Sequence, residues 1–262
     1  MPELDLLIVL GTIGSLSGFL SGLLGIGGGI VLTPLLLYVP PLLGYPILSI
    51  KIVAGLTIVQ GILGCLVGAI SHRKFHFLSV KLAIYMGATI FLAAFVGAAG
   101  SKYIPGRVLL IVFAFLALTA AVLILIPKKE DPENPDVNRL TFSRLRAVGS
   151  ALGVGIFGGM VGQGGSFILI PLMTSFVQIP TRIAIGSNLA IILFSSLAGF
   201  LGKAFTGQIK WILTIPLVLT VIPAARLGSL ISRKVPVKVL RKILAIIIVF
   251  AAIRIGISAF SG

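Results

Sequence analysis

The amino-acid sequence predicts an all-α polytopic membrane protein built from two inverted five-segment repeats with re-entrant or broken-helix hairpins. Three observations point to this fold class. Of the 262 residues, 58% are hydrophobic and only 10% are charged, so the chain is too apolar for an ordinary soluble surface. A glycine cluster followed by proline occurs once in each half. Each half also contains five apolar segments, an odd number, and a polar linker separates the halves.

Ten apolar segments are predicted to be helices. The run 109–126 is apolar on every face, whereas strands of an outer-membrane barrel would alternate between apolar and polar residues. The first repeat spans 1–126, the linker 127–146 and the second repeat 147–262. The ten segments lie at 6–24, 28–44, 51–70, 79–100, 108–126, 147–161, 165–179, 183–202, 211–231 and 239–258.

A glycine cluster joins the first two segments of each half. It reads Gly22-Leu-Leu-Gly-Ile-Gly-Gly-Gly-Ile-Val-Leu-Thr-Pro34 in the first half and Gly159-Met-Val-Gly-Gln-Gly-Gly-Ser-Phe-Ile-Leu-Ile-Pro171 in the second. Glycines break a helix and bare backbone N–H groups, which a bilayer tolerates only where protein or a water-filled cavity covers them. Arms of roughly 17 residues reach about 25 Å, less than the ~30 Å hydrocarbon core. Each pair is therefore expected to form a hairpin whose tip is the glycine cluster.

The last three segments of each half repeat as well. A basic residue near the start of the third segment recurs as Lys51 and Arg182, and several glycines recur at corresponding positions. Because each repeat contributes an odd number of segments, the second repeat enters the membrane from the opposite face. This arrangement predicts alternating access about a pseudo-two-fold axis in the membrane plane. The corresponding glycines are Gly55 and Gly186, Gly68 and Gly199, and Gly97 and Gly228.

The net charge of +15 is unevenly distributed along the chain. Fourteen Lys and Arg residues fall on the side of the bilayer that holds the linker, and five fall on the other side. Cytoplasmic loops carry an excess of Lys and Arg, so we expect a cytoplasmic linker and both termini outside. The bulk charge then reflects topology, and nucleic-acid binding is not expected. The five residues on the opposite side are Lys51, Lys102, Arg107, Lys203 and Lys210.

Several classes of protein are disfavoured. Glu3 and Asp5 precede the first apolar segment and no Lys or Arg does, so the basic region of a cleavable signal peptide is missing. Cys65 is the single cysteine and is expected to be a small buried apolar side chain. No metal-binding set and no nucleophile with a nearby base is visible in the segments, so neither a cofactor nor an enzymatic activity is expected.

Each hairpin is expected to place a helix start inside the membrane, near Gly28 and near Gly165. The first N–H groups of a helix have no partner within it and present partial positive charge, and glycines let a small anion approach them. Close helix packing is the alternative role, which we favour for Gly14, Gly18 and Gly22. The predicted substrate-binding residues are Gly25, Gly27, Gly28, Gly29, Thr57, Gly162, Gln163, Gly164, Gly165, Ser166, Ser187 and Asn188.

Polar side chains inside the segments allow two interpretations. Gln60 and Asn188 can form hydrogen bonds between helices or contact a ligand. Arg226 is a candidate for anion attraction, although it can also extend to the bilayer surface. His72 and His76 are expected in a solvated cytoplasmic loop. All six acidic residues lie outside the segments, which disfavours carboxylate-driven coupling and leaves open a proton carried on the substrate or a sodium ion held by backbone carbonyls.

Through these motifs the chain resembles the TauE/SafE sulfite exporter family, also called the TSUP permeases. The resemblance rests on the two glycine hairpins and on the helices that follow them, which begin Ala54-Gly-Leu-Thr57 and Ile185-Gly-Ser-Asn188. It implies an inner-membrane permease of a prokaryote for small sulfur-containing or carboxylate anions, such as sulfite or sulfonates. Family members commonly have Thr-Ser where this chain has Leu56-Thr57 and Ser187-Asn188, which leaves the exact anion open.

Together these features predict a secondary transporter that moves a small anionic substrate across the lipid bilayer by alternating access. A passive anion channel is the alternative, because the same donors can line a pore. A membrane enzyme or assembly factor is a weaker alternative. The direction of transport, the coupling ion and the formation of a homo-oligomer are left open.

Overall fold

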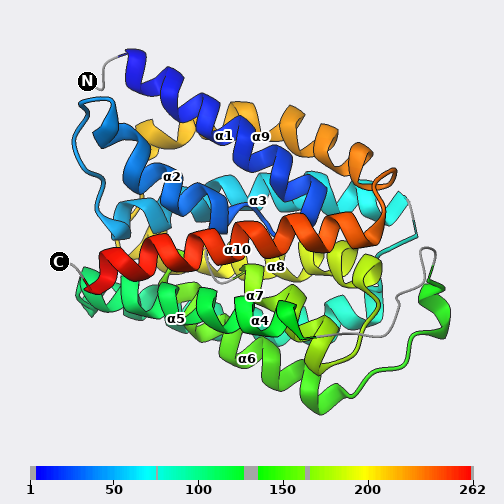
Figure 1. Ribbon diagram of the computed structural model, residues 1–262. Helices are drawn as coiled ribbons and strands as arrows, with labels where there is room; N and C mark the ends of the chain where they lie inside the picture. The colour runs from blue at the N-terminus through cyan, green and yellow to red at the C-terminus, as the bar shows by residue number, and fades with distance from the viewer. Residues whose placement is uncertain (1–3, 75, 127–134, 163–165, 261–262) are drawn as a thin grey trace.

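The computed structural model describes residues 4–74, 76–126, 135–162 and 166–260, and in these ranges the chain is helical without β-strands. Most helices run along the long direction of one bundle (Figure 1), which confirms the all-α fold class. A π-helix at Leu172–Phe176 follows α7. The α-helices of the described ranges are α1 (Leu4–Leu24), α2 (Gly29–Leu42), α3 (Ile50–Lys74), α4 (Val80–Gly100), α5 (Gly106–Leu125), α6 (Arg144–Met160), α7 (Ser166–Pro171), α8 (Thr181–Phe205), α9 (Trp211–Ser232) and α10 (Val237–Phe260).

Six of the described helices, α1, α3, α4, α5, α8 and α9, are long and apolar enough to cross a bilayer. Their apolar spans contain 19 to 25 residues, which corresponds to about 28–38 Å against a hydrocarbon core of about 30 Å. Large apolar side chains cover their outer faces, such as Leu92 at 70%, Phe115 at 64% and Leu219 at 67% exposure. Lipid is the environment in which such faces are stable, so the chain is an integral multi-pass membrane protein.

The arms of the hairpins differ in length, which corrects part of the prediction. α1 has 21 residues and is one of the six spanning helices, so the expectation that the first arm is too short to cross was wrong for it. α2 has 14 residues, or about 21 Å. In the second half, α7 has only six residues and continues as the π-helix, so segment 165–179 is not one regular helix. α6, the first arm of the second half, has 17 residues and is not one of the six, so α1 is the one hairpin arm among the described helices that is long enough to cross.

Corresponding helices of the two halves exchange partners. α1 packs along α9 and α4 along α6, while α3 packs on α8 and α5 on α10. A Cβ atom on Gly97 would overlap the carbonyl oxygen of Ile156, and a Cβ atom on the corresponding Gly228 would overlap that of Phe19. Such an exchange follows when two similar halves are related by a two-fold axis. How the halves are oriented in a bilayer stays a prediction.

Close packing explains the glycines of α1. A Cβ atom on Gly22 would overlap the carbonyl oxygen of Ala225, and one on Gly18 would lie 3.0 Å from the Cα atom of Val221. Gly14 meets α9 in the same way. The packing role expected for these three glycines is therefore confirmed.

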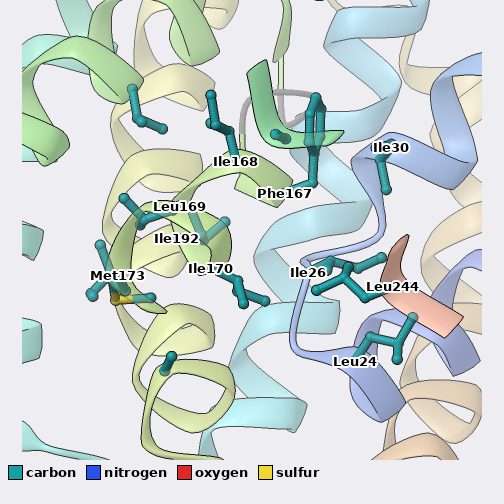
Figure 2. Close-up of a cluster of buried hydrophobic side chains, with 14 of the residues drawn as sticks. Leu24, Ile26, Ile30, Phe167, Ile168, Leu169, Ile170, Met173, Ile192 and Leu244 are labelled. Atoms are coloured by element: carbon teal, nitrogen blue, oxygen red, sulfur yellow. The ribbon is translucent and has the colours of Figure 1, made fainter. Parts of the chain in front are cut away.

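The hydrophobic core surrounds the chain between α1 and α2. Ile26, in this connection, belongs to one buried cluster with Ile170 of α7 and Leu244 of α10 (Figure 2). The rings of Phe113 and Phe167 extend the cluster, with centroids 5.5 Å apart. The side chains of this cluster thus cover the non-helical backbone between α1 and α2. Such cover by protein is the condition for irregular backbone at membrane depth.

Candidate functional site

The first helix break consists of the residues between α1 and α2. Gly25, Gly27 and Gly28 have φ angles of 69°, 70° and 85°, in the left-handed region that glycine adopts at little cost and other residues avoid. Figure 2 shows the extended trace between Leu24 and Ile30. The whole connection is buried. The glycine cluster is therefore required by the path of the backbone as well as by packing.

The start of α2 forms one side of this break. Gly28 is the N-cap residue, and its carbonyl oxygen accepts hydrogen bonds from the N–H groups of Val31 and Leu32 at 3.1 and 2.9 Å. The first N–H groups of an α-helix have no acceptor within the helix, and the aligned peptide dipoles give them partial positive charge. α2 therefore begins inside the protein with the electrostatics that favour an anion.

Polar side chains of α1 and α3 meet the same place. The Ser17 hydroxyl donates to the Gly28 carbonyl oxygen at 3.1 Å. Gln60 is fully buried, and neither its Oε1 nor its Nε2 atom has a hydrogen-bond partner among the described residues. Its Oε1 atom lies 3.3 Å from the position that a Cβ atom on Gly28 would take. A buried amide without partners costs about 1–3 kcal/mol, so a ligand that bonded to it would recover that cost.

Ser21 extends this polar lining by one turn of α1. Its hydroxyl is buried and has no partner in the described structure. A Cβ atom on Gly64 would lie 3.5 Å from Ser21 Oγ and 3.9 Å from Gln60 Nε2, so Gly64 leaves room between α1 and α3 at this level. Gln60 also lies near the middle of α3, which places the cluster at mid-membrane depth if α3 spans the bilayer.

Asn188 brings the second half of the chain to the first break. Its Nδ2 atom donates to the Gly25 carbonyl oxygen at 2.5 Å, while its Oδ1 atom is buried with no partner in the part of the chain that the structure describes. A Cβ atom on Gly25 would lie 2.6 Å from the carbonyl oxygen of Ile185, so α8 packs directly on the break. The prediction that Asn188 lies close to a glycine cluster is consistent with this geometry.

The second break has the same backbone relationship to the first half. Gly162 has a φ angle of 87°, and a Cβ atom there would lie 2.6 Å from both Ala54 O and Thr57 Oγ1. Thr57 itself donates to the carbonyl oxygen of Ala54 at 3.0 Å. Thr57 and Asn188 occupy corresponding positions, so each faces the break of the other half. Gln163, Gly164 and Gly165 lie outside the described residues, as does the side chain of Ser166.

Two predicted residues have other surroundings. The Ser187 hydroxyl accepts a hydrogen bond from the N–H group of Ser79 at 2.9 Å, which joins α8 to the start of α4. Arg226 has an exposed side chain on α9, whereas the residues that meet the first break are buried. The structure therefore does not bring Arg226 to the glycine break. Gly27 and Gly29 lie within the break and at the first position of α2.

His72 corrects the expectation of a solvated loop. α3 continues to Lys74, and His72 is only 2% exposed, with its Nε2 atom 3.2 Å from the carbonyl oxygen of Gly22. The helix is longer than the apolar run because its last turn packs against the end of α1. His76, which follows the helix, is exposed as expected.

The serine and glutamine side chains of the first break have no polar counterparts at the corresponding positions of the second half. Ser17, Ser21 and Gln60 are replaced at the corresponding positions of the second half by Val154, Gly158 and Ile191. The lining consists of neutral donors and acceptors, and the described residues contain no group of three or more His, Cys, Asp or Glu placed to hold a metal ion. Helix N–H groups, hydroxyls and an amide suit the binding of a small anion.

The comparisons agree with a transport role. A model of the family described as Sulfite exporter TauE/SafE matches residues 10–255. The chain is 23% identical over 259 residues to the probable membrane transporter protein YunE of Bacillus subtilis, covering 92% of this chain and 94% of that protein. It is 26% identical over 251 residues to a probable membrane transporter protein of Xylella fastidiosa, covering 95% and 94%.

A third relative comes from an archaeon. The probable membrane transporter protein MJ0441 of Methanocaldococcus jannaschii is 24% identical over 255 residues, which covers 94% of this chain and 92% of that protein. No solved structure gives a significant match. The family model extends from α1 to α10 and includes both glycine breaks. The chain therefore belongs to the sulfite exporter TauE/SafE family and is a membrane transporter.

Proposed function

We propose that this transporter moves a small sulfur-containing oxyanion, such as sulfite or a short sulfonate, and binds it at the first helix break. The observation that supports this site best is the buried, unpartnered amide of Gln60 beside the start of α2 at Gly28. An oxyanion would accept hydrogen bonds from the first N–H groups of α2 and from Gln60 Nε2. The Ser21 hydroxyl and the Nδ2 group of Asn188, which donates one of its two N–H bonds to Gly25, complete the proposed donors.

The size and charge of the proposed substrate follow from the lining. The glycines let a ligand approach the backbone closely, but they provide no long side chain that could contact a bulky ligand. Gln60, Ser17, Ser21 and Asn188 are neutral, so the helix dipole supplies the positive potential for an anion. The family name adds sulfite as the substrate class to test first.

Alternating access by two inverted repeats is the proposed mechanism. The exchange of partners between the halves supports it, because a two-fold arrangement allows the same contacts to form on either side of the central site. α3 and α8, which contact each other, carry Gln60 and Asn188 to this centre. A cytoplasmic linker and external termini are part of the same proposal, since the excess of Lys and Arg lies on the linker side.

A passive anion channel is the second candidate. It is favoured by the sequence positions of all six acidic residues, which lie outside the spanning helices or in the first turn of α1 and leave no carboxylate at mid-membrane for coupling. Recordings from planar bilayers separate the two functions. Sustained unitary currents carried by sulfite would indicate a channel, whereas saturable uptake that accelerates when sulfite is present on the opposite side would indicate a carrier.

Binding is tested by thermal denaturation of the purified protein with sulfite, thiosulfate, sulfoacetate, taurine, sulfate and acetate. A ligand that binds only the folded state raises the apparent stability by about 2.7 kcal/mol at a hundredfold excess over Kd. Gly28→Val should abolish the response to the best anion, because the new side chain would fill the space beside Gln60. Gly44→Val is the matched control.

This control separates the effect of steric crowding around the new side chain from the effect of backbone strain at positive φ. Gly44 has a φ angle of 86°, close to the 85° of Gly28, but a Cβ atom there would meet nothing within 4 Å. Both variants therefore carry similar backbone strain, and only Gly28→Val closes the site. An unchanged response in Gly28→Val would exclude the first break as the binding site. Absence of any response in the wild-type protein, together with absence of flux, would contradict the proposed substrate class.

A further inference from the structure

A buried lysine lies at one end of α8, far along the helix from the first break. Lys203 is 0% exposed and is the third residue from the end of α8. Its ammonium group donates to Ser101 Oγ at 2.8 Å and to Gln208 Oε1 at 3.2 Å. These two acceptors are neutral. A side chain that reached for the bilayer surface would expose its charged end, so extension to the surface does not explain Lys203.

A second cation adjoins it. Lys51, the second residue of α3, donates to the carbonyl oxygen of Lys102 at 2.7 Å and lies within electrostatic range of Lys203. Among the described residues the carboxylates are those of Asp5, which is exposed in the first turn of α1, and Asp136, which pairs with Arg139. No described contact joins Lys203 to a carboxylate. Lys203 and Lys51 therefore bond to neighbouring residues, Ser101 and Lys102, and neither has an acidic partner among the described residues.

The opposite end of α3 and α8 carries a corresponding pair of residues. His72, at the position corresponding to Lys203, is buried near the end of α3, and Arg182, corresponding to Lys51, is 8% exposed and within electrostatic range of it. Arg182 donates to the carbonyl oxygens of Ser232 and Val235. Lys51 and His72 are separated by about 31 Å along α3, close to the thickness of the hydrocarbon core. Each end of the α3–α8 pair therefore carries a pair of cationic or titratable side chains.

A buried charge is stable only with compensation, and like charges placed together need it most. Ser101 and Gln208 satisfy two of the three N–H donors of Lys203 without supplying negative charge. An anion of one or two charges would compensate both ammonium groups and accept the remaining donors. Lys51 lies about 13 Å from Gln60 along α3, so the two places are separate positions on one helix.

We propose that Lys203 and Lys51 form a second anion-binding site, through which the oxyanion passes between the water phase and the first break. This inference rests on the proposed function, since it assigns to the same substrate a further site on its route. Lys203 supplies the buried charge, Lys51 adds to the potential, and Ser101 with Gln208 fixes the position of the ammonium group. The predicted ligand class is a tetrahedral or pyramidal oxyanion such as sulfite or sulfate.

The test uses the full-length protein in proteoliposomes, with sulfite as the probe. Lys203→Gln keeps the hydrogen-bonding capacity toward Ser101 but removes the charge, and it should raise the half-saturating sulfite concentration about tenfold, as expected for one lost charge-assisted hydrogen bond. Lys203→Arg should retain most of the affinity. Lys102→Gln is the matched control, because Lys102 is an exposed lysine at the same end of the bundle and should change the value less than twofold.

The outcomes separate this inference from the proposed function. If the wild-type protein responds to sulfite but Lys203→Gln and Lys102→Gln behave alike, the second site is refuted while the first break stands. If Lys203→Gln does not fold, Lys51→Gln provides the same comparison and should weaken sulfite binding in the same direction. In the Gln60→Ile variant, a residual thermal shift with sulfite that disappears on adding Lys203→Gln would establish two sites, and complete loss with Gln60→Ile alone would contradict the second one.

Discussion

The two helix breaks share their backbone geometry and differ in their lining. Gly25 and Gly162 both adopt left-handed φ angles and both pack on the backbone of the other half, at Ile185 and Ala54. The first break is lined by polar side chains such as Gln60, whereas Ile191 occupies the corresponding position in the second half. The two halves thus share the feature that shapes the chain and differ in the side chains at corresponding positions. The geometry is a requirement of the fold, and the polar lining is the candidate for function.

The shared geometry predicts the largest effects. Gly25→Ala and Gly162→Ala should each lower the free energy of unfolding by about 2–4 kcal/mol, because a Cβ atom would be strained at positive φ and would collide with backbone 2.6 Å away. Gly207→Ala is the control, since Gly207 has a φ angle of 71° with nothing within 4 Å. Unfolding in detergent measures all three. Tolerance of alanine at one break and not at the other would show that the breaks are not equivalent.

The different lining predicts that a substitution at Gln60 raises the stability of the protein and weakens its binding of sulfite. Gln60→Ile gives the first break the residue of the second and should raise the free energy of unfolding by about 1–3 kcal/mol, because an unpartnered buried amide is removed. The same variant should lose most of its thermal shift with sulfite. Ile191→Gln, the reverse change, should destabilise the protein by a similar amount and leave the sulfite response intact. A more stable Gln60→Ile protein that still binds sulfite would remove Gln60 from the site.

Asn188 and Thr57, which occupy corresponding positions, are expected to give smaller effects and to differ between the two breaks. Asn188→Ala breaks the hydrogen bond to Gly25 and should cost about 1–2 kcal/mol of stability, with weaker sulfite binding. Thr57→Ala removes a hydroxyl that donates to Ala54 in its own helix and should cost less than about 1 kcal/mol. Paired unfolding curves and sulfite titrations measure both. Equal effects on sulfite binding would mean that the second break contributes to the site as much as the first.

The elements of the fold were predictable because a membrane helix is indicated by the local composition of its own segment. Nine of the ten apolar segments each correspond to one α-helix in the described residues, and segment 165–179 is divided between α7 and the π-helix. The glycine breaks were predictable as well, since consecutive glycines within apolar sequence are costly in a helix and indicate positive φ angles. The length of α1 was misjudged because its helix begins at Leu4 and includes Asp5, which an apolar window leaves out.

The lining of the site was less predictable because it depends on tertiary packing. Ser17 and Ser21 are ordinary small residues of an apolar helix, and only the return of the chain at Gly28 gives them a role. Ser187 lies beside Asn188 in sequence, yet successive helical residues face different directions, and it bonds to Ser79. His72 was assigned to a loop because charged residues follow it, whereas the helix continues to Lys74.

Substitution of Arg226 is expected to have the smallest effect, and it tests whether exposed charge contributes to anion binding. Its side chain is exposed on α9, so Arg226→Ala should change the free energy of unfolding by less than about 0.5 kcal/mol. The half-saturating sulfite concentration should stay within twofold of the wild-type value, because nothing in the first break depends on this side chain. Sulfite flux at low and high ionic strength measures the effect. A large loss of affinity confined to low ionic strength would show that exposed charge attracts the anion before it reaches the buried donors, and the positive potential of the helix start would then be only part of the selectivity for anions.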